Sequence, residues 1–351
     1  MAASRTEFHK VTVARVDSLT EDSAAVTFDV PDGLRDQFRF APGQSLTIRR
    51  DGERRSYSIC SARGRPPRIG VREVAGGAVS GWLVHQVRPG DVIEVQTPAG
   101  SFTPELDRPG HHVLIAAGSG ITPILSIAWS VLAARDDSSV TLIYGNRRSD
   151  TVMFADEIAD LKDAYPARAC LVHVLSREPQ EVELFSGRLD PAKLGALLPA
   201  TVDTGSVDHW WLCGPYEMVE GALGVLAGLG VPRSRTHREL FYVEDAPPPE
   251  ATHEELPPGP GAEVTIILDG RSSTVTVPPG TAILDGGQQA RPDLPFACKG
   301  GVCGTCRARV TSGKVTMRRN YALEPEEVAA GYVLTCQSLP VTDAVTVNYD
   351  S

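Results

Sequence analysis

Residues 298–306 read Cys-Lys-Gly-Gly-Val-Cys-Gly-Thr-Cys, and a fourth cysteine, Cys336, follows after 29 intervening residues. The spacing C-x4-C-x2-C with a distant fourth cysteine is the ligand pattern of a plant-type [2Fe–2S] cluster. Glycines between the cysteines let the backbone turn tightly and point its N–H groups at the sulfurs. The stretch therefore predicts a metal–sulfur centre, and its expected ligands are Cys298, Cys303, Cys306 and Cys336.

A structural zinc site, a disulfide pair and buried thiols are the alternatives for these cysteines. Zinc ribbons present two separated C-x2-C knuckles, whereas three of these cysteines share one glycine-rich loop, which favours the cluster. The other three cysteines each lie alone inside an apolar run. We expect all three to be small buried hydrophobic side chains: Cys60, Cys170 and Cys213.

Length and charge limit the possible functions. The chain has 351 residues, which leaves room for two or three domains, and a formal net charge of −10. No basic domain is available to neutralise phosphates, so we expect no nucleic-acid partner. The first ten residues contain no apolar core of a secretory signal, and a thiolate cluster fits a reducing compartment, so a cytoplasmic location is expected.

Residues 113–134 form a run of 22 residues without a charge, long enough in principle to span a bilayer. Gly118, Gly120 and Pro123 interrupt this run near its middle. A strand, a turn and a buried helix explain it better, so we expect no membrane span.

The pattern of strands and helices predicts a multidomain α+β chain. Residues 1–106 contain six short β-type runs separated by Pro, Gly and Asp, which indicates an antiparallel Greek-key β-barrel. In residues 107–243 apolar strands alternate with helices, as in a parallel α/β domain. Residues 244–261 are rich in Pro and acids and indicate an extended linker. Residues 262–351 fit a β-grasp domain that carries the cysteine loop.

Two glycine turns of the α/β domain point to a dinucleotide. The first apolar strand runs into the turn Gly118–Pro123, where we expect Thr122 to cap the next helix and Pro123 to occupy its first position. This turn departs from G-x-G-x-x-G at its last position, and an ordinary tight turn is the alternative. A second turn, Cys213-Gly214-Pro215, ends a later strand, at the edge of the sheet where α/β domains bind ligands.

The barrel contains the short motif Arg55-Ser56-Tyr57-Ser58 on one strand. Alternation along the strand places Arg55 and Tyr57 on one face and Ser58 on the other. A guanidinium for phosphate, an aromatic plane and a nearby hydroxyl suit a flavin. An ordinary solvated barrel face with a Tyr and an Arg is the alternative.

The order of these motifs resembles the ferredoxin–NADP reductase superfamily with an appended plant-type ferredoxin domain, over nearly the whole chain except the linker. The segments LIYGNRRSD, SREPQEVELFSGRLD, RELF and NYALEPEEVAAGYVLTCQSLP more closely resemble the reductase subunits of phenylacetyl-CoA epoxygenases.

The resemblance implies roles for individual residues. Arg55 would bind the flavin phosphates, Tyr57 would stack on the isoalloxazine, and Ser58 would hydrogen-bond near its N5. A second phosphate-binding turn at residues 76–80 favours FAD over FMN. Cys213 would lie beside the nicotinamide, and Glu239 and Phe241 would close the other side of the flavin. The implied catalytic residues are Ser58, Cys213 and Glu239, and the implied cofactor-binding residues also include Gly77, Val79, Ser80, Gly118, Gly120, Thr122, Pro123, Gly214, Pro215 and Phe241.

The choice between NADPH and NADH is a question of charge. Ser176 and Arg177 end one strand and Arg147 follows the preceding one, so cations can meet a ribose 2′-phosphate there. Glu178 instead suits a free 2′-hydroxyl, as in NADH. We expect NADPH, with NADH as the alternative.

The resemblance implies electron flow from NADPH through FAD and the [2Fe–2S] cluster to a separate oxygenase component, a di-iron epoxygenase that acts on phenylacetyl-CoA. Flavins convert two-electron into one-electron chemistry. The sequence has no Glu-x-x-His carboxylate set for a di-iron site of its own, so oxygenation falls to the partner. The alternatives are reduction of another oxygenase or a hybrid-cluster protein with NADH, and a non-enzymatic iron–sulfur redox sensor.

Overall fold

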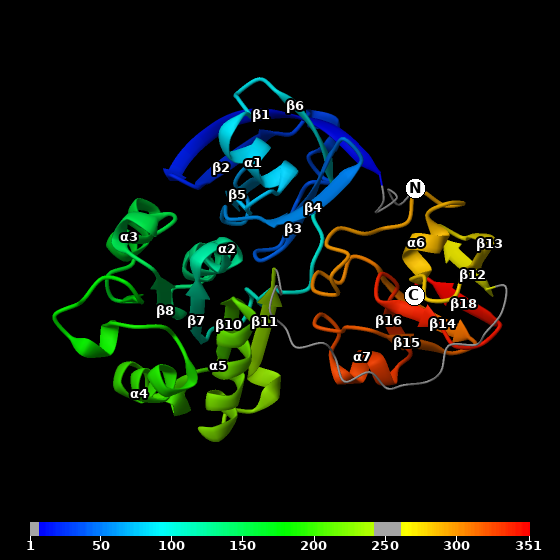
Figure 1. The fold of residues 1–351 in the computed structure, drawn as a ribbon. Coiled ribbons are helices and arrows are strands. Elements are labelled where there is room, and N and C mark those ends of the chain that lie inside the picture. The colour runs from blue at the N-terminus through cyan, green and yellow to red at the C-terminus, as the bar shows by residue number, and fades with distance from the viewer. Residues whose placement is uncertain (1–6, 242–260) are drawn as a thin grey trace. The chain divides into compact units, whose positions relative to one another are not determined.

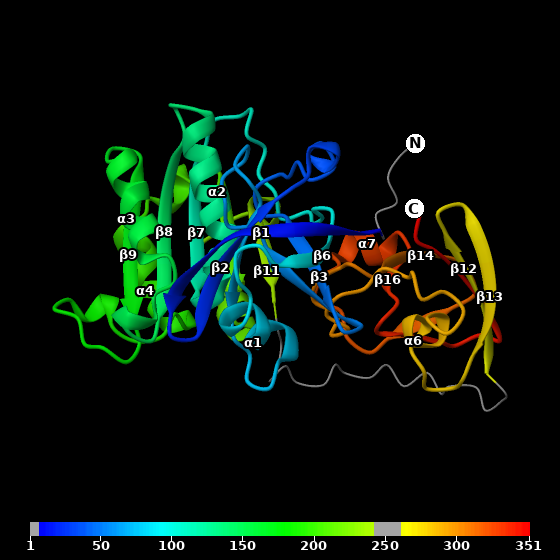
Figure 2. The ribbon, with the colours of Figure 1, turned by 90° about the horizontal axis from the view of Figure 1, so that it is seen from above.

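The computed structural model describes residues 7–241 and 261–351 (Figures 1 and 2). Phe8–Phe241 form one compact unit, and the C-terminal residues form a second unit. Residues 244–260 of the predicted linker lie outside the described residues.

The N-terminal part of the first unit is an antiparallel β-barrel. Its six strands follow the order β4-β3-β6-β1-β2-β5, and a bridge between Ile59 and Ile69 joins its two edge strands and closes the sheet. Alternate side chains fill the interior, where Phe28, Leu46 and Ile93 are buried. The elements are β1 (Phe8–Thr20), β2 (Ser23–Asp29), β3 (Ser45–Arg50), β4 (Glu53–Ser58), β5 (Arg68–Arg72), α1 (Ala78–His85) and β6 (Val92–Gln96).

The second part of this unit is an α/β domain around a five-stranded parallel sheet. The strand order is β11-β10-β7-β8-β9, so β10 pairs with β7, the first strand of this domain, and β11 lies at the edge beyond β10. Its elements are β7 (His111–Ala117), α2 (Ile121–Ala134), β8 (Ser139–Asn146), α3 (Ala155–Ala164), β9 (Ala169–Leu175), α4 (Pro191–Thr201), β10 (His209–Gly214), α5 (Tyr216–Gly228) and β11 (Thr236–Leu240).

The uncharged run at residues 113–134 forms strand β7, a short 3-10 turn at Gly118–Gly120 and the almost entirely buried helix α2, as predicted. Its apolar character therefore reflects burial between a sheet and a barrel. Within the described residues, none of the helices has both the length and the apolar character that crossing a membrane requires.

Cys170 corrects one prediction. Cys60 and Cys213 are buried as expected, but Cys170 is exposed. The reason is that β9 is the edge strand of the parallel sheet. The rest of the protein therefore does not cover all of the side chains on this strand. Residues Cys170 and His173 consequently face solvent although they stand in an apolar run.

A partly buried ion-pair network joins the barrel to the α/β domain. The guanidinium of Arg68 on β5, only 11% exposed, donates to both carboxylate oxygens of Glu157 on α3 at 2.8 Å and to Asp17 on β1 at 3.0 Å. Next to it, the backbone of Gly70 lies so close to α2 that a Cβ there would overlap Thr122 Cγ2 and stand 2.8 Å from Phe154 Cζ. These contacts fix the two domains against each other.

The second unit is a β-grasp domain, as predicted. A mixed sheet of order β13-β12-β18-β14-β16 has parallel pairing only between β12 and β18 among its strand pairs in the described residues. The elements are β12 (Ala262–Leu268), β13 (Arg271–Val277), α6 (Ile283–Gly287), β14 (Arg307–Ser312), β15 (Val315–Met317), α7 (Pro325–Ala329), β16 (Tyr332–Leu334), β17 (Ser338–Pro340) and β18 (Ala344–Asn348).

The tight contact at Gly70 predicts that adding one methyl group there lowers the stability of the first unit. Gly70→Ala must push Thr122 or Phe154 aside, and we expect it to destabilise the first unit by roughly 1–3 kcal/mol, as overpacking of a tight contact does. Gly195→Ala is the control, because Gly195 lies on helix α4 with open space around it. That change should stabilise by about 0.5–1 kcal/mol through helix propensity. Urea unfolding followed by flavin release measures both, and equal stability of Gly70→Ala and wild type would contradict the packing described.

Candidate functional site

Strand β4 carries the proposed flavin-binding residues. Arg55 is half exposed, and its guanidinium lies 3.1 Å from the carboxylate of Glu53. Tyr57 is partly buried against the barrel core, and burial raises its pKa, so its ring is neutral. Ser58, the last residue of β4, is buried. The strand therefore offers a cation, a flat neutral ring and a hydroxyl within one short segment.

Ser58 meets the other two candidate catalytic residues across the domain boundary. Its hydroxyl donates to Oε2 of Glu239 on β11 at 3.1 Å. Glu239 is the register partner of Cys213 on the neighbouring parallel strand β10. Burial raises the pKa of Glu239 to about 8, against the opposing hydrogen bond from Ser58, and burial also raises the pKa of Cys213. The structure thus brings together residues far apart in sequence, in neutral form near pH 7.

Phe241 lies close to this group. It is partly buried and packs against the core cluster that includes Trp211 and Cys213. It stands directly after β11, so the same strand end carries both Glu239 and Phe241.

The turn before helix α1 has the geometry expected of a phosphate-binding turn. Gly76 has a φ of +74°, and Gly77 precedes the helix, where a Cβ would stand 2.7 Å from Ser80 Oγ. The buried Ser80 hydroxyl accepts from the N–H of Val74 at 3.1 Å. Val79 is buried and anchors the first turn of the helix. The first backbone N–H groups of this helix have no side-chain cap from Gly77, so they are able to donate to an anion.

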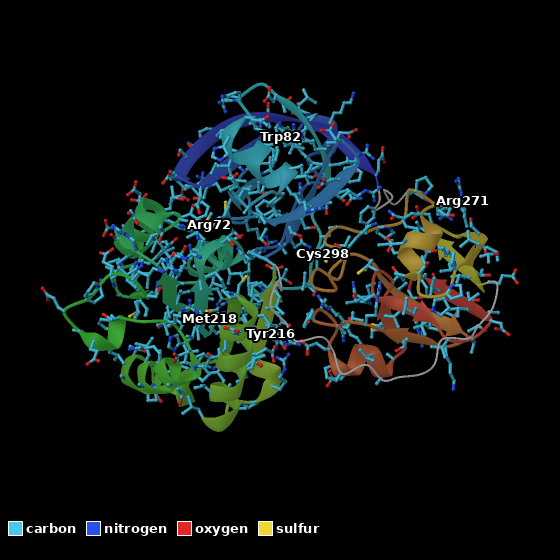
Figure 3. The ribbon with its side chains drawn as sticks, in the orientation of Figure 1. Arg72, Trp82, Tyr216, Met218, Arg271 and Cys298 are labelled. Atoms are coloured by element: carbon cyan, nitrogen blue, oxygen red, sulfur yellow. The ribbon has the colours of Figure 1, made fainter. Side chains whose placement is uncertain are left out.

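The two glycine turns of the α/β domain touch each other. A Cβ on Gly120 would overlap the carbonyl oxygen of Cys213, so only glycine fits there. Gly118 has a φ of +55°, and its carbonyl accepts from the hydroxyl of the buried Tyr144 at 2.9 Å. Gly214 packs over Met218, and the guanidinium of Arg72 of the barrel lies close to Gly118. Figure 3 labels Met218 and Arg72. The turns ending β7 and β10 therefore lie in contact at the carboxyl edge of the sheet.

The prediction that Thr122 caps helix α2 is wrong. Helix α2 begins at Ile121 after Gly120 and has no side-chain cap. The hydroxyl of Thr122, buried inside the first turn, donates instead to the carbonyl of Ser119 at 3.0 Å. Pro123 is the third residue of the helix, where its missing N–H costs no hydrogen bond because the first-turn donors have no partners within the helix. The N–H groups of this turn are therefore not satisfied by a Thr122 cap.

The residues expected to choose between NADPH and NADH lie where β8 and β9 end. Backbone N–H groups of Ser176 and Arg177 donate to the carbonyls of Asn146 and Arg147, which brings the two strand ends together. Arg147 and Arg177 are exposed. The carboxylate of Glu178 accepts from the N–H and hydroxyl of Ser149 at 2.9 and 3.0 Å, and these bonds lower its pKa.

Asn146 is a residue that the sequence analysis missed. It is 7% exposed, and neither atom of its side-chain amide meets the distance and angle of a hydrogen bond within the described parts of the chain, although the amide lies close enough to the Tyr144 hydroxyl to lower the pKa of that group. A buried amide without partners is costly, and at the carboxyl end of β8 it faces the ligand-binding edge of the sheet. The available signal was a polar residue ending an apolar strand, just before Arg147.

The four cysteines of the second unit lie as two pairs. A hydrogen bond with Cys303 lowers the pKa of Cys298 to about 5, and the same bond raises that of Cys303. Cys306 and Cys336 form the second pair, in which the pKa of Cys306 is raised and that of Cys336 lowered. In the described residues, no three His, Cys, Asp or Glu side chains have the arrangement of a single-ion site. Two thiolate pairs suit two irons with two sulfurs each.

The backbone of the loop supports these sulfurs. The N–H of Gly300 donates to Cys298 Sγ at 3.3 Å, and the N–H of Gly301 contributes to lowering the pKa of Cys336. Gly301 and Gly304 have φ values of +80° and +68°, which favour glycine. The donor set and the turned backbone fit an anionic [2Fe–2S] cluster.

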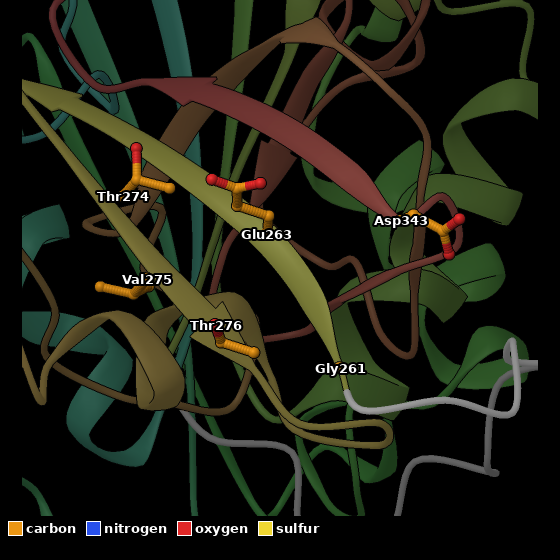
Figure 4. A pocket seen from close by; sticks show the side chains of 6 residues that line it. All are labelled: Gly261, Glu263, Thr274, Val275, Thr276 and Asp343. Atoms are coloured by element: carbon orange, nitrogen blue, oxygen red, sulfur yellow. The ribbon is translucent and has the colours of Figure 1, made fainter.

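A hollow elsewhere on the second unit lies outside this site (Figure 4). None of the candidate site residues lines it, and its lining is made of Gly261, Glu263, Thr274, Val275, Thr276 and Asp343.

Family models agree with the geometry. An oxidoreductase FAD-binding domain matches residues 10–103, an oxidoreductase NAD-binding domain matches residues 114–223, and a 2Fe-2S iron-sulfur cluster binding domain matches residues 266–341. The chain is thus an NAD(P)H-dependent flavin and iron–sulfur oxidoreductase, with one domain for each cofactor. Electrons pass from NAD(P)H to FAD and then to a [2Fe–2S] cluster.

Comparison with whole proteins narrows this class. The chain is 42% identical to one of the subunits of 1,2-phenylacetyl-CoA epoxidase from Escherichia coli K12, over 99% of both chains. It is 35% identical to the ferredoxin reductase component of 3-ketosteroid-9-alpha-monooxygenase from Rhodococcus rhodochrous, over 97% of this chain and 96% of that one. The chain belongs to the ferredoxin–NADP reductase superfamily, in the family of reductase components with a C-terminal ferredoxin domain that includes these relatives.

Solved structures have the same fold. Phthalate dioxygenase reductase superposes with a TM-score of 0.61 at 22% identity, covering 97% of this chain and 98% of that one. An Amycolatopsis cytochrome P450 reductase superposes with a TM-score of 0.57 at 28% identity, covering 66% of this chain and 69% of that one.

The raised pKa of Glu239 predicts a titration that can be measured. The carboxyl should lose its proton with a midpoint of about 8, well above its ordinary 4.5. Because the unfolded chain releases this proton first, the free energy of unfolding should fall relative to Glu239→Gln as pH rises from about 4.5 to about 8, by up to about 1.4 kcal/mol per pH unit.

Infrared spectra of wild type minus Glu239→Gln report the protonated carboxyl directly. Ser58→Ala, which removes the hydrogen bond to the carboxylate, should move the midpoint further upward. A midpoint near 4.5 in wild type would contradict the burial of this group.

Proposed function

We propose that this chain is the NADPH-oxidising reductase component of a multicomponent di-iron oxygenase that epoxidises phenylacetyl-CoA. The observation that carries the proposal is the 42% identity, from end to end, to the 1,2-phenylacetyl-CoA epoxidase polypeptide of Escherichia coli K12. The segments quoted from the sequence for this resemblance lie in the α/β domain and around the cysteine loop, so the likeness is not confined to one cofactor domain.

The residues of the first unit divide the work of hydride transfer. Bound FAD supplies the conversion of a two-electron hydride into single electrons, which a bound [2Fe–2S] cluster carries one at a time. In our proposal Tyr57 covers one flavin face, and Arg55 leaves Glu53 for the flavin phosphate. Cys213 provides a dry, uncharged wall for the nicotinamide, since burial raises its pKa. The Ser58 hydroxyl donates a hydrogen bond to Glu239, whose carboxyl is neutral near pH 7, next to Cys213.

The charged residues where β8 and β9 end support NADPH as the dinucleotide. Glu178 is the group that would accept from a free 2′-hydroxyl, and its carboxylate is already held by Ser149. Arg147 and Arg177 are exposed and have no ion pair within the described residues. A phosphate placed between them would receive charge-assisted hydrogen bonds. The buried amide of Asn146 lies at the same strand end and can donate to the same ribose.

Substitution of Arg177 tests the choice of dinucleotide. Arg177→Ala should raise the KM for NADPH about ten-fold or more and leave that for NADH nearly unchanged, because a charge-assisted hydrogen bond contributes about 1.5–3 kcal/mol. Arg135→Ala is the matched control, since Arg135 is a half-buried arginine of the same domain that pairs with Asp137. Steady-state reduction of ferricyanide gives both constants. Equal changes for the two dinucleotides would remove Arg177 from the selectivity.

Reconstitution with purified oxygenase components tests the partner. With the oxygenase components of phenylacetyl-CoA epoxidase, we expect NADPH oxidation coupled to formation of the epoxide. With the oxygenase component of 3-ketosteroid-9-alpha-monooxygenase, we expect uncoupled, slow NADPH oxidation. Cys303→Ser should abolish coupled turnover while the flavin is still reduced. Product formation with the ketosteroid component and none with the epoxidase would refute the proposed partner but leave the reductase activity intact.

A further inference from the structure

A chain of hydrogen bonds reaches the cluster loop from the C-terminal end of the protein. Thr335 is fully buried and immediately precedes Cys336. Its hydroxyl donates to the carbonyl oxygen of Cys306 at 2.9 Å, and its backbone N–H donates to the same oxygen at 3.2 Å. The hydroxyl of Tyr349 lies 2.7 Å from the hydroxyl of Thr335.

The direction of this chain follows from the number of protons. A threonine hydroxyl has one proton, and here that proton goes to Cys306. Tyr349 must therefore donate to Thr335, which in turn donates to the carbonyl of Cys306. Each bond orients the next, and a hydroxyl that both donates and accepts is fixed in rotation.

Backbone hydrogen bonds hold both ends of this hydrogen-bond chain in place. Tyr349 donates its N–H to the carbonyl of Ile267 on β12, and the next residue, Asp350, accepts from the N–H groups of Asp269 and Gly270 at 2.7 and 2.9 Å. On the other side, the carbonyl of Thr335 accepts from the N–H of Leu284 on α6. Thr335 is thus a junction between the sheet, the short helix and the cysteine loop.

The junction acts on one pair of cluster ligands. Cys306 and Cys336 are hydrogen-bonded to each other and form one of the two sulfur pairs. Thr335 is covalently joined to Cys336 and doubly hydrogen-bonded to Cys306, so it fixes the backbone of one ligand against that of the other. Groups that support metal ligands in this way tune metal retention and electronic properties.

We propose that Thr335 and Tyr349 are positioning residues for the cluster. The hydrogen-bond chain from Tyr349 through Thr335 to Cys306 holds the Cys306 and Cys336 pair at the separation that one iron requires. It thereby slows iron loss and sets the spectroscopic signature and midpoint potential of the cluster. This role concerns the cluster and is independent of the identity of the oxygenase.

Variants of the full-length, cofactor-loaded protein separate the hydrogen bonds from packing. Thr335→Val keeps the shape and removes the hydroxyl, whereas Thr335→Ser keeps the hydroxyl. Tyr349→Phe removes only the first donor of the chain. The matched controls are Thr265→Val, whose hydroxyl bonds Thr274 in the exposed β12–β13 hairpin, and Tyr332→Phe, whose ring stacks with Arg307.

Three readouts are needed: the rate of iron release to a ferrous chelator, the electron paramagnetic resonance spectrum of the reduced cluster, and its midpoint potential. We expect Thr335→Val to release iron about five-fold faster or more, the factor for about 1 kcal/mol per buried hydrogen bond, with a changed spectrum and potential. Tyr349→Phe should change all three in the same direction by less. Thr335→Ser and both controls should behave as wild type.

Several outcomes would overturn the proposal. Wild-type release, spectrum and potential in both Thr335→Val and Tyr349→Phe would do so. Failure of Thr335→Ser to restore wild-type values would assign the effect to the threonine methyl group rather than to the hydroxyl. If Thr335→Val assembles no cluster, comparison of Tyr349→Phe with Tyr332→Phe decides, and equal values for these two would refute the role of the chain.

Discussion

The hydrogen bond from Ser58 to Glu239 is the contact on which the arrangement of the candidate site depends. It joins the end of a barrel strand to the last strand of the parallel sheet, 181 residues later. Register then places Cys213 beside Glu239, and the carbonyl of Cys213 lies against Gly120. A shift of any of these strands would separate the candidate catalytic residues from one another. The network around Arg68 and the close packing at Gly70 resist such a shift.

The two ends of the candidate dinucleotide site, around Ser58 and where β8 and β9 end, have opposite electrostatic character. Around Ser58 the groups are buried and neutral, because burial raises the pKa of Tyr57, Cys213 and Glu239. Where β8 and β9 end, Arg147 and Arg177 are exposed and charged. A hydride is transferred best where water is excluded, and a phosphate is recognised best by fixed cations. One ligand that is uncharged at one end and anionic at the other matches this division.

Much of the fold was predictable because its signals are local. Cysteine spacing, strand alternation and the uncharged run at residues 113–134 each depend on neighbouring residues, and the cluster loop, the barrel and β7 with α2 follow from them. What depends on distant parts of the chain was harder. The exposure of Cys170 depends on which strand is at the edge of the sheet. The hydroxyl of Thr122 donates to the carbonyl of Ser119 and does not cap the N–H groups of the helix. The buried amide of Asn146 and the Tyr349–Thr335 bond become visible only when the chain is folded.

The low exposure of Arg68 has a consequence for how the protein responds to ionic strength. Its guanidinium is 11% exposed, so dissolved ions screen its pairing with Glu157 and Asp17 far less than they screen fully exposed pairs. Added salt therefore leaves the alignment of flavin and nicotinamide within Phe8–Phe241 nearly unchanged, whereas it weakens encounters guided by exposed charges. At saturating NAD(P)H, a salt titration can thus distinguish reduction of the flavin within this unit from delivery of electrons to a charged acceptor.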